Sequence, residues 1–339
     1  FEDINYSFDG GIYPEKVNNR SFEFFNVNKI DEDDIHTKKW TPIGEATFEA
    51  ANEPGFGMND NNTYYLVLDI VNPGDGISNE GFQGVSINAG EKYDISMYIK
   101  GEKASENITV KVEKDGKVYA QGTMGEAEDS KYGQWKKLTG EMYAEESIDG
   151  AVINFYFPSA GRYYIDFVSV YPQATYNNRE NGLRADFVEI LKAVNPGFLR
   201  FPGGCVVEGN SKLAQRYQWK KSIGPLEERE VNSNRWGNNN DPYYYMTYGF
   251  GYYEYLLLCE DIGAKPIPVL HGGVACSGEV VPWEDMEWYV QDALDLIEFC
   301  NGDSNDPNQP WAQKRAEMGH PEPFNIEYIA FGNENEGQD

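Results

Sequence analysis

The sequence predicts an α/β domain that carries an inserted all-β sandwich. Between residues 21 and 172, short apolar or alternating runs recur between turn signals and no helical period is sustained, which is typical of antiparallel strands. From about residue 176 onward the pattern alternates between helix and strand, with polar loops after the strands. Such repeated units predict a parallel sheet with helices outside it. We therefore divide the chain into residues 1–20, 21–172 and 173–339.

The composition limits the possible functions. With 40% hydrophobic and 25% charged residues, the 339-residue chain is expected to be globular, as two domains or one domain with a large insertion. The net charge of −28 argues against nucleic acid and anionic membrane surfaces as partners, because polyanions would be repelled. No apolar run reaches transmembrane length. A neutral ligand fits better, and aromatic rings, at 14% of residues, are the platforms that sugar binders use, although most are expected to fill the sandwich core.

The sequence predicts no cofactor and no metal site. The glycine-rich strand ends lack GxGxxG and GxxxxGK(S/T), so no phosphate cradle is expected. Four cysteines stand at positions 205, 259, 276 and 300, and none forms a CxxC pair, which argues against a zinc knuckle. The chain begins at Phe1 without Met or a signal peptide, so we expect it to be processed or trimmed.

The insertion is expected to be a jelly-roll sandwich. Turn residues at 72–74, 115–116 and 149–150 separate the strands, and residues 111–119 predict a hairpin with a two-residue turn. Glu23 and Asp166 offer the oxygen ligands that suit calcium, but we interpret them as surface carboxylates. The expected strands are 64–70, 85–87, 93–99, 108–114, 135–138, 151–157 and 163–170.

The α/β part is expected to alternate regularly. Residues 1–6 are a candidate strand, followed by a Gly-Gly loop. An apolar stripe over 183–194 predicts a helix that Asn195-Pro196-Gly197 stops, and Gly263 is the expected stop of a second helix. The further expected elements are strands 198–201, 265–270 and 326–331, helix 248–262, and helix 282–300 with Trp283, Met286, Val290, Ala293, Leu294 and Ile297 on its buried face.

The last stretch carries the first candidate for chemistry. Residues 326–331 read as a strand covered on both faces, Gly332 allows a tight turn, and Asn333 and Glu334 follow. A carboxylate at the carboxyl end of a barrel strand points to where barrel enzymes do chemistry. In a partly apolar pocket it can keep a proton and act as a general acid. The alternative is a solvated Glu334 in a loop.

Five segments stand in an order and spacing that is far more specific than any one of them, and through them the chain resembles glycoside hydrolase family 51, the α-L-arabinofuranosidases. The resemblance covers residues 1–20 and about 173–339. The segments are Phe1-Glu2-Asp3-Ile4-Asn5, Arg200-Phe201-Pro202-Gly203-Gly204, Ile223-Gly224-Pro225, Asn234-Arg235-Trp236-Gly237 and Gly332-Asn333-Glu334.

The inserted residues 21–172 look like a carbohydrate-binding module of the family 4/9 sandwich type, a looser match. It rests on Asn19-Arg20-Ser21-Phe22-Glu23, Trp40-Thr41-Pro42 and Tyr164-Ile165-Asp166-Phe167-Val168.

The resemblance implies a fold and a site. The fold would be a (β/α)₈ barrel, with its N-terminal half present here and the jelly-roll sandwich inserted. Glu334 would be the general acid/base, and Asn333 would bind the sugar 2-hydroxyl. Glu2 and Arg200 would line the pocket for the terminal arabinofuranose. Cys205 stands where many members have a sugar-binding Asn, and we include it among the substrate-binding residues.

The family nucleophile is a Glu on a later barrel strand, whereas this chain stops at Asp339. We therefore expect a fragment of a longer protein or one piece of a nicked one, which would not catalyse alone. His271 stays outside the catalytic set, as a structural histidine at a strand end.

Three functions remain open from the sequence. The first is a retaining, exo-acting α-L-arabinofuranosidase that removes side chains from arabinoxylan or arabinan. The second is an endo-acting glucanase or xylanase on the same barrel type, which an open cleft would distinguish from a pocket. The third is a non-catalytic sugar-binding protein. A plant cell-wall polysaccharide or arabino-oligosaccharide is the expected partner, in an extracellular or periplasmic compartment.

Overall fold

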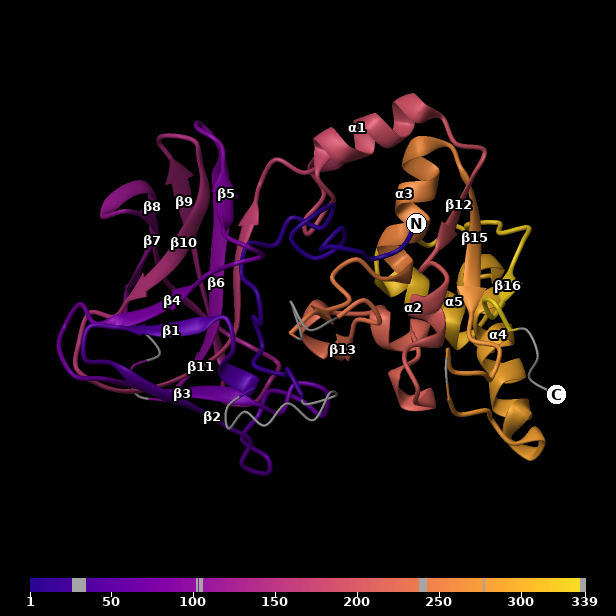
Figure 1. The fold of residues 1–339 in the computed structure, drawn as a ribbon, viewed down its shortest axis with the longest axis horizontal. Coiled ribbons are helices and arrows are strands. Elements are labelled where there is room, and N and C mark those ends of the chain that lie inside the picture. Colours follow the sequence, from indigo (N-terminus) through magenta and orange to yellow (C-terminus); the bar gives the residue numbers. More distant parts are fainter. Residues whose placement is uncertain (26–34, 102, 104–105, 238–242, 277, 336–339) are drawn as a thin grey trace. The chain divides into compact units, whose positions relative to one another are not determined.

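The computed structural model describes residues 1–25, 35–101, 103, 106–237, 243–276 and 278–335. Two compact units make up the chain: residues 9–184, and residues 1–8 together with 185–339 (Figure 1). In the described part of the chain, every helix is too short or too polar to cross a membrane.

Residues 9–184 form the sandwich unit, a nearly closed antiparallel sheet of the jelly-roll kind. The strand order is β1-β4-β10-β7-β8-β9-β6-β11-β3-β2, and β5 pairs with β10. The predicted strands are confirmed. The pattern missed β1, β2, β4 and most of β8, of which only the start lies in the predicted hairpin. The strands are β1 Trp40–Ile43, β2 Thr47–Ala51, β3 Tyr65–Ile70, β4 Gly76–Asn79, β5 Val85–Ile87, β6 Lys92–Lys100, β7 Ile108–Lys114, β8 Lys117–Asp129, β9 Lys136–Ala144, β10 Ile148–Tyr156 and β11 Gly161–Pro172.

The sandwich core follows from strand alternation. On β7, Ile108, Val110 and Val112 are fully buried, while the residues between them are partly exposed. Each fully buried aliphatic side chain stabilises the fold by about 1.5–3 kcal/mol relative to an exposed one. The predicted hairpin is also confirmed. Lys114 pairs with Lys117 across the two residues Asp115 and Gly116, both at positive φ as a type I′ turn requires.

The interpretation of Glu23 and Asp166 as surface carboxylates is wrong. Asp166 is fully buried, and while its Oδ1 accepts the Phe167 N–H at 2.7 Å, its Oδ2 has no hydrogen-bond partner among the described residues. Glu23 accepts the Tyr64 N–H at 2.6 Å. Burial raises the pKa of Glu23 to about 7. Burial, and then the charge of Glu23, raise the pKa of Asp166 well above its ordinary value.

The second unit contains the predicted parallel sheet. Strand β15 (Lys265–Leu270) lies between β12 (Phe198–Phe201) and β16 (Ala330–Phe331), and a short antiparallel pair joins β13 (Asn232–Ser233) to β14 (Tyr245–Met246). The helices are α1 Ala185–Val194, α2 Cys205–Glu208, α3 Tyr252–Ile262, α4 Met286–Asn301 and α5 Pro310–Glu317. The 3₁₀ turns of the whole chain are η1 Ile35–Thr37, η2 Tyr176–Asn178, η3 Leu213–Gln215, η4 Trp219–Ser222, η5 Leu226–Glu228 and η6 Trp283–Asp285.

Three details of the second unit differ from the prediction. Residues 1–6 have an irregular backbone rather than a strand. The predicted strand 326–331 is a strand only at Ala330–Phe331, which pair with Val269 and Leu270 of β15. Helix α5 was not predicted, because its residues are polar and show no apolar stripe.

Two tyrosine hydroxyls of helix α3 hydrogen-bond to the parallel sheet. Tyr255 donates to the Leu199 carbonyl on β12 at 2.7 Å, and Tyr252 donates to the Val269 carbonyl on β15 at 2.5 Å. Gly263 ends the helix in the left-handed conformation, as predicted.

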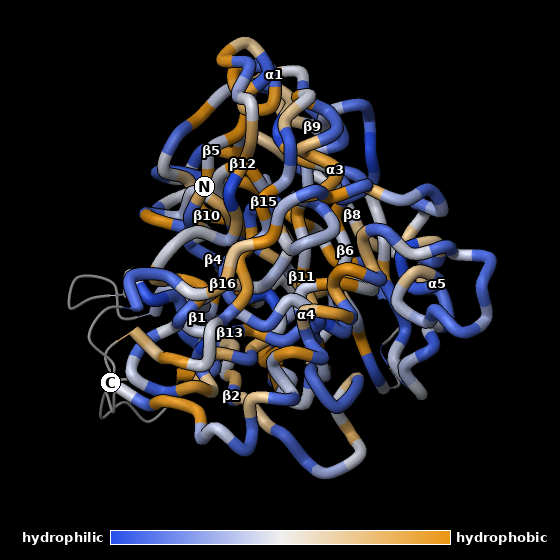
Figure 2. The backbone as a smooth tube through the Cα atoms, turned by 90° about the vertical axis from the view of Figure 1, so that its right-hand side faces the viewer, coloured by the Kyte–Doolittle hydropathy of each residue, from blue (hydrophilic) through white to orange (hydrophobic). Residues whose placement is uncertain are grey.

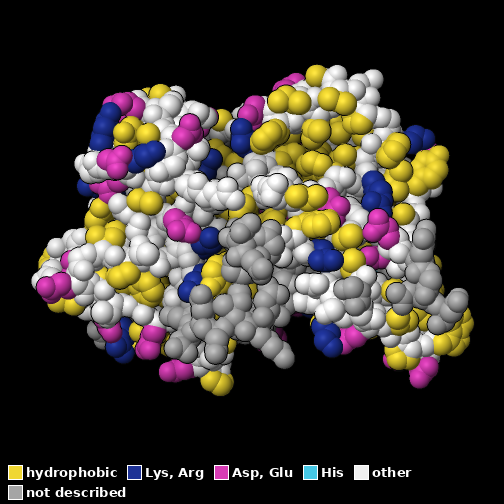
Figure 3. Space-filling model, in the orientation of Figure 1, with side chains coloured by type: hydrophobic (Ala, Val, Ile, Leu, Met, Phe, Trp, Pro, Cys, Tyr) yellow, Lys and Arg dark blue, Asp and Glu magenta, His cyan; other side chains and the backbone are white. Residues whose placement is uncertain are grey.

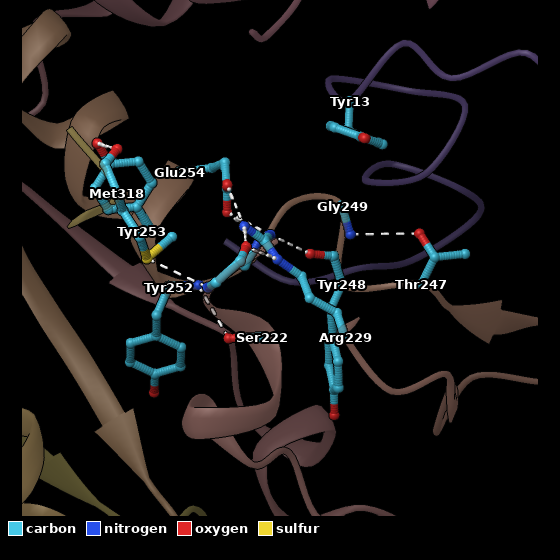
Figure 4. A network of polar contacts seen from close by, with 12 residues as sticks. Tyr13, Ser222, Arg229, Thr247, Tyr248, Gly249, Tyr252, Tyr253, Glu254 and Met318 are labelled. Atoms are coloured by element: carbon cyan, nitrogen blue, oxygen red, sulfur yellow. Dashed lines mark hydrogen bonds and ion pairs between the residues drawn. The ribbon is translucent and has the colours of Figure 1, made fainter. Parts of the chain in front are cut away.

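A buried ion pair fixes the start of α3 (Figure 4). Arg229 contacts Glu254 at 2.8 Å and also donates to the carbonyls of Gly224 and Tyr248. Glu254 accepts the Gly251 N–H at 2.9 Å and thereby caps the helix. The segment around Ile223-Gly224-Pro225 thus has a structural role in orienting α3.

The predicted buried face of the helix at 282–300 is wrong for the described residues. Ala293 is buried, but Trp283 is 87% exposed and Val290, Leu294 and Ile297 are also exposed. Helix α1 likewise exposes Ile190 and Val194. Its trace alternates between hydrophobic and hydrophilic residues (Figure 2), and hydrophobic side chains gather on the surface where α1 lies (Figure 3). Both helices therefore present apolar faces that the described residues of the chain leave uncovered.

Candidate active site

The carboxyl ends of three neighbouring parallel strands converge in the second unit. Strand β12 leads through Pro202-Gly203-Gly204 to Cys205, β15 leads to His271, and β16 leads through Gly332 to Asn333 and Glu334. Because parallel neighbours end at the same edge of a sheet, their loops deliver side chains to one place.

Four of the predicted site residues lie in one chain of contacts. The Arg200 guanidinium donates from Nη2 to Asn333 Oδ1 at 3.3 Å. The Asn333 amide lies 3.8 Å from Cys205 Sγ, and the Cys205 thiol lies 3.9 Å from Glu334 Oε2. Charged, amide, thiol and carboxyl groups therefore adjoin one another at this sheet edge.

Glu2, the fifth predicted residue, reaches the same edge from the N-terminal segment. Its Oε1 accepts the Val206 N–H at 3.0 Å and the Trp236 indole N–H at 3.1 Å. The indole contact is part of the Asn234-Arg235-Trp236-Gly237 segment, so this segment helps to position the Glu2 carboxylate.

The two glycines after β12 make this convergence possible. A Cβ on Gly203 would lie 2.5 Å from the Glu2 side chain, and Gly203 has a φ of +122° that other residues rarely adopt. A Cβ on Gly204 would lie 2.7 Å from Asn333 Oδ1. Glycine at both positions is thus required for Glu2 and Asn333 to approach the strand end.

Glu334 has a backbone conformation that is uncommon for its residue type. Its φ is +49°, in the left-handed region that costs a non-glycine residue free energy. Such conformations cluster at functional sites, where the surrounding structure enforces them. The side chain is exposed, so the described residues do not form the partly apolar pocket that the sequence suggested.

Two residues close to the site were missed from the sequence. Glu208 is buried, and one of its oxygens accepts the Asn333 backbone N–H at 3.1 Å and the Asn335 amide at 2.8 Å. Burial raises its pKa. Cys276, in the loop after β15, hydrogen-bonds with both Cys205 and Glu208. Glu208 follows the Cys205 position by one helical turn, which is the signal that was available.

Asp3 holds in place the loop that contacts Glu2. It is fully buried and accepts hydrogen bonds from the Tyr244 hydroxyl at 2.7 Å, the Asn234 amide at 2.9 Å and the Phe8 N–H at 2.9 Å. Because Asn234 also receives the Trp236 N–H at 2.8 Å, Asp3 holds the loop that carries Trp236 to Glu2.

Two further groups at the sheet edge have shifted pKa values. Burial, followed by the hydrogen bond with Cys276, raises the pKa of Cys205 to about 11, so its thiol is protonated at neutral pH. Burial, followed by the charge of Arg216, lowers the pKa of His271 to about 4. His271 accepts the Gly273 N–H on Nδ1 at 2.9 Å and is neutral, in keeping with its place outside the predicted catalytic set.

Comparisons with known proteins bear on the same regions. Residues 190–339 match a family described as the α-L-arabinofuranosidase 1 domain, and residues 14–161 match a carbohydrate-binding domain of the 4/9 type. The arabinose-bound structure of MgGH51 α-L-arabinofuranosidase superposes with a TM-score of 0.85 and 30% identity, over 98% of this chain and 53% of that one. The chain is thus similar to the α-L-arabinofuranosidases of glycoside hydrolase family 51. Its resemblance to that family, with an inserted carbohydrate-binding module, is thereby confirmed.

Curated relatives agree with this similarity. An extracellular exo-α-L-arabinofuranosidase of Streptomyces chartreusis is 38% identical over 98% of this chain and 39% of its own length. α-L-Arabinofuranosidase 1 of Arabidopsis thaliana is 31% identical over 100% of this chain and 48% of its own length. The chain thus spans about half the length of these curated relatives, or less.

Proposed function

We propose that this chain contributes the acid/base half of the active site of a retaining, exo-acting α-L-arabinofuranosidase that removes arabinofuranosyl side chains from plant polysaccharides. The observation that carries the proposal is the contact chain from Arg200 through Asn333 and Cys205 to Glu334. It joins a cation, an amide and a carboxyl group at the carboxyl ends of parallel strands, where barrel enzymes act.

Each side chain has a role in this proposal. Glu334 protonates the leaving oxygen and later activates water, and Asn333 binds the 2-hydroxyl, whose hydrogen bond strengthens in the transition state. Arg200, Glu2 and Cys205 line the pocket for the terminal sugar. Arg200 donates to Asn333 Oδ1 and so orients the amide. The NH₂ group contacts Cys205 Sγ, and its second hydrogen can be donated to a sugar oxygen.

A retaining mechanism also needs a nucleophilic carboxylate about 5–5.5 Å from the acid/base. We place it in the half of the relatives that this chain does not span, on a later strand of a (β/α)₈ barrel. In this proposal β12, β15 and β16 belong to the N-terminal half of that barrel. The exposed apolar faces of α1 and α4 support it, because barrel helices normally bury such faces against neighbouring units.

The acid/base role predicts a dependence on the leaving group. Glu334→Ala in the full-length protein should reduce hydrolysis of natural arabinosides by about 10²–10⁴-fold, because their leaving groups need protonation. The glycosylation step with an aryl arabinoside whose leaving group departs unaided should be hurt far less. Azide should restore turnover of that substrate and yield the arabinosyl azide of retained α-configuration, because azide enters on the face that Glu334 occupied.

The matched control is Glu327→Ala. Glu327 forms an exposed ion pair with Lys265, and its removal should leave all of these rates within a factor of two or so. Equal losses on good and poor leaving groups, without azide rescue, would contradict the assignment and indicate that Glu334 only positions the substrate.

The sandwich unit offers a separate contact for polysaccharide. A polar groove crosses the sheet over β6, β8 and β9, lined by Asp94, Asn107, Thr123, Thr139 and Glu141. Tyr143 lies two residues beyond Glu141 on the same face of β9 and is 51% exposed. We assign this groove to carbohydrate binding, with the polar side chains hydrogen-bonding hydroxyls and the ring of Tyr143 stacking on a sugar face.

A further inference from the structure

Three potential metal ligands that the proposed mechanism does not need as a group lie together at the edge of the parallel sheet. Cys205 Sγ, Cys276 Sγ and a carboxylate oxygen of Glu208 all lie within 4.8 Å of one another. Cys205 and Glu208 come from the segment after β12, and Cys276 comes from the loop after β15. We propose that these residues form a binding site for a thiophilic divalent cation, with Zn²⁺ as the ion that fits best.

The donor set selects the ion. Two sulfur ligands favour Zn²⁺ over Mg²⁺ or Ca²⁺, which prefer oxygen. Zn–S bonds of about 2.3 Å and Zn–O bonds of about 2.0–2.2 Å in a tetrahedron place sulfur atoms about 3.8 Å apart and sulfur and oxygen about 3.5 Å apart. The observed separations of at most 4.8 Å therefore need the sulfur atoms to close in by about 1 Å at most, and each sulfur–oxygen pair by about 1.3 Å at most.

The carboxylate is already oriented for such a role. Asn335 and the Asn333 N–H donate to the same oxygen, Oε1 of Glu208, and a carboxylate oxygen of Glu208 lies within 4.8 Å of both cysteine sulfurs. Hydrogen bonds of this kind fix ligating carboxylates in known metal sites. Glu208 is also buried, so an ion there would be partly desolvated and held by groups that do not need to be ordered on binding.

The electrostatics favour a cation once the thiols lose their protons. Two thiolates and one carboxylate supply three negative charges against the two positive charges of Zn²⁺. Arg235 donates to Cys276 Sγ at 3.6 Å, and its positive charge offsets the remaining negative charge. The acidic chain as a whole, with a net charge of −28, concentrates cations near its surface.

The three protein ligands leave a fourth tetrahedral position open, as in zinc sites that are not purely structural. Cys205 Sγ lies 3.9 Å from Glu334 Oε2 and 3.8 Å from the Asn333 amide, so an ion on Cys205 would occupy the space beside both. If the proposed function is right, Zn²⁺ is then an inhibitor that competes with the terminal sugar.

Binding is tested without any activity measurement. Co²⁺ added to the reduced full-length protein should give the intense thiolate-to-cobalt absorption band, and Zn²⁺ should abolish it by displacement. Cys276→Ser should remove the band and weaken Zn²⁺ binding in calorimetry more than ~100-fold, while Asn335→Ala, which loosens Glu208, should weaken it about 10–100-fold. Cys300→Ala removes a fully buried cysteine elsewhere in the unit and should change neither result.

Absence of the cobalt band would overturn the proposal, as would a band that survives Cys276→Ser or a disulfide between Cys205 and Cys276 in the protein as isolated. Inhibition is a separate readout, taken relative to each variant's own metal-free rate. Zn²⁺ should raise the KM for an aryl arabinoside at least tenfold in the parent protein and not in Cys276→Ser. A cobalt band without inhibition would support the metal site and refute the inhibition by Zn²⁺. A protein without arabinosidase activity would refute the proposed function and leave the metal result intact.

Discussion

The two units of this chain treat their apolar side chains in opposite ways. In the sandwich unit, strand alternation sends Val110, Ile153 and Phe155 into a core where they are fully buried. In the unit with the parallel sheet, Ile190 on α1 and Leu294 on α4 remain more than half exposed. The antiparallel unit therefore closes its core with its own residues, whereas the described residues of the parallel unit leave apolar side chains of its helices uncovered.

This contrast predicts a large difference between two isoleucine substitutions. Ile153→Ala removes a fully buried side chain from the sandwich and should lower the free energy of unfolding of that unit by about 2–5 kcal/mol. Ile190→Ala, at a position that is 58% exposed, should change stability by less than about 0.5 kcal/mol in the 339-residue chain. Urea unfolding of both variants, followed by limited proteolysis to assign each transition to its unit, makes the comparison.

The same two variants also show whether the contrast between the units is correct. If Ile190→Ala costs as much as Ile153→Ala in the 339-residue chain, the face of α1 is covered and the contrast between the units is wrong. If the cost appears only in a longer protein that includes the remaining half of the relatives' length, the added residues cover α1, as the barrel proposal requires.

The second prediction concerns the buried carboxyl groups of the sandwich. Glu23 has its pKa raised from an ordinary 4.5 to about 7 by burial, so the folded unit keeps a proton that the unfolded chain releases. Its contribution to stability is complete below about pH 4.5, falls as the pH rises, and is lost above about pH 7. The total is on the order of 3 kcal/mol, since each pKa unit corresponds to 1.36 kcal/mol.

Thermal unfolding in chelator-treated buffer from pH 4.5 to 8 measures this effect. The melting temperature of the sandwich transition should fall over that range, and Glu23→Gln should flatten much of the fall. The pKa of Asp166 is raised as well. The melting temperature of Glu23→Gln should therefore still fall somewhat with pH, and adding Asp166→Asn should remove that remaining fall. A stability that rises with pH in the parent protein would show that these two groups are ionised in the folded unit. Lys117–Glu146, an exposed pair, supplies the neutral control through Glu146→Gln.

The sequence predicted the sandwich better than it predicted the second unit. Alternation locates strands directly, and the Asp115-Gly116 turn marks a hairpin by its own chemistry. In the helix at 282–300, periodicity showed which face has apolar residues, but not that Val290 and Leu294 would stay exposed, because burial depends on what packs against a face. Glu23 and Asp166 were misjudged in the opposite direction. They were predicted to be exposed and are buried, because the sequence carries no signal that a carboxyl group is buried.

The site was predictable only where strand order determines it. Arg200 and Asn333 come from the ends of parallel strands, and their contact follows from that topology. Glu2 reached the same edge although its segment is not a strand, because Gly203 leaves room for it. Cys276 was missed because the return path of the loop after β15 depends on tertiary contacts that a local pattern does not contain. Glu208 was missed although it follows Cys205 by one helical turn, a local signal that the sequence does contain.

The smallest expected effect concerns the surface of the sandwich. Although that unit buries nearly all of its large apolar side chains, Tyr143 stays exposed beside the polar groove, which a purely structural role does not require. Tyr143→Ala should weaken binding of arabinoxylan oligosaccharides by about 1–2 kcal/mol, or roughly tenfold, because it removes an exposed aromatic ring on which a sugar face can stack. Isothermal titration of the catalytically disabled Glu334→Ala protein measures this without hydrolysis.

The control is Val71→Ala, an exposed apolar position in the loop after β3, which should leave the affinity unchanged. If Tyr143→Ala binds as tightly as its parent while Glu141→Ala does not, hydrogen bonding in the groove carries the affinity. If neither change matters, the exposed ring has no part in recognition and the groove assignment is wrong.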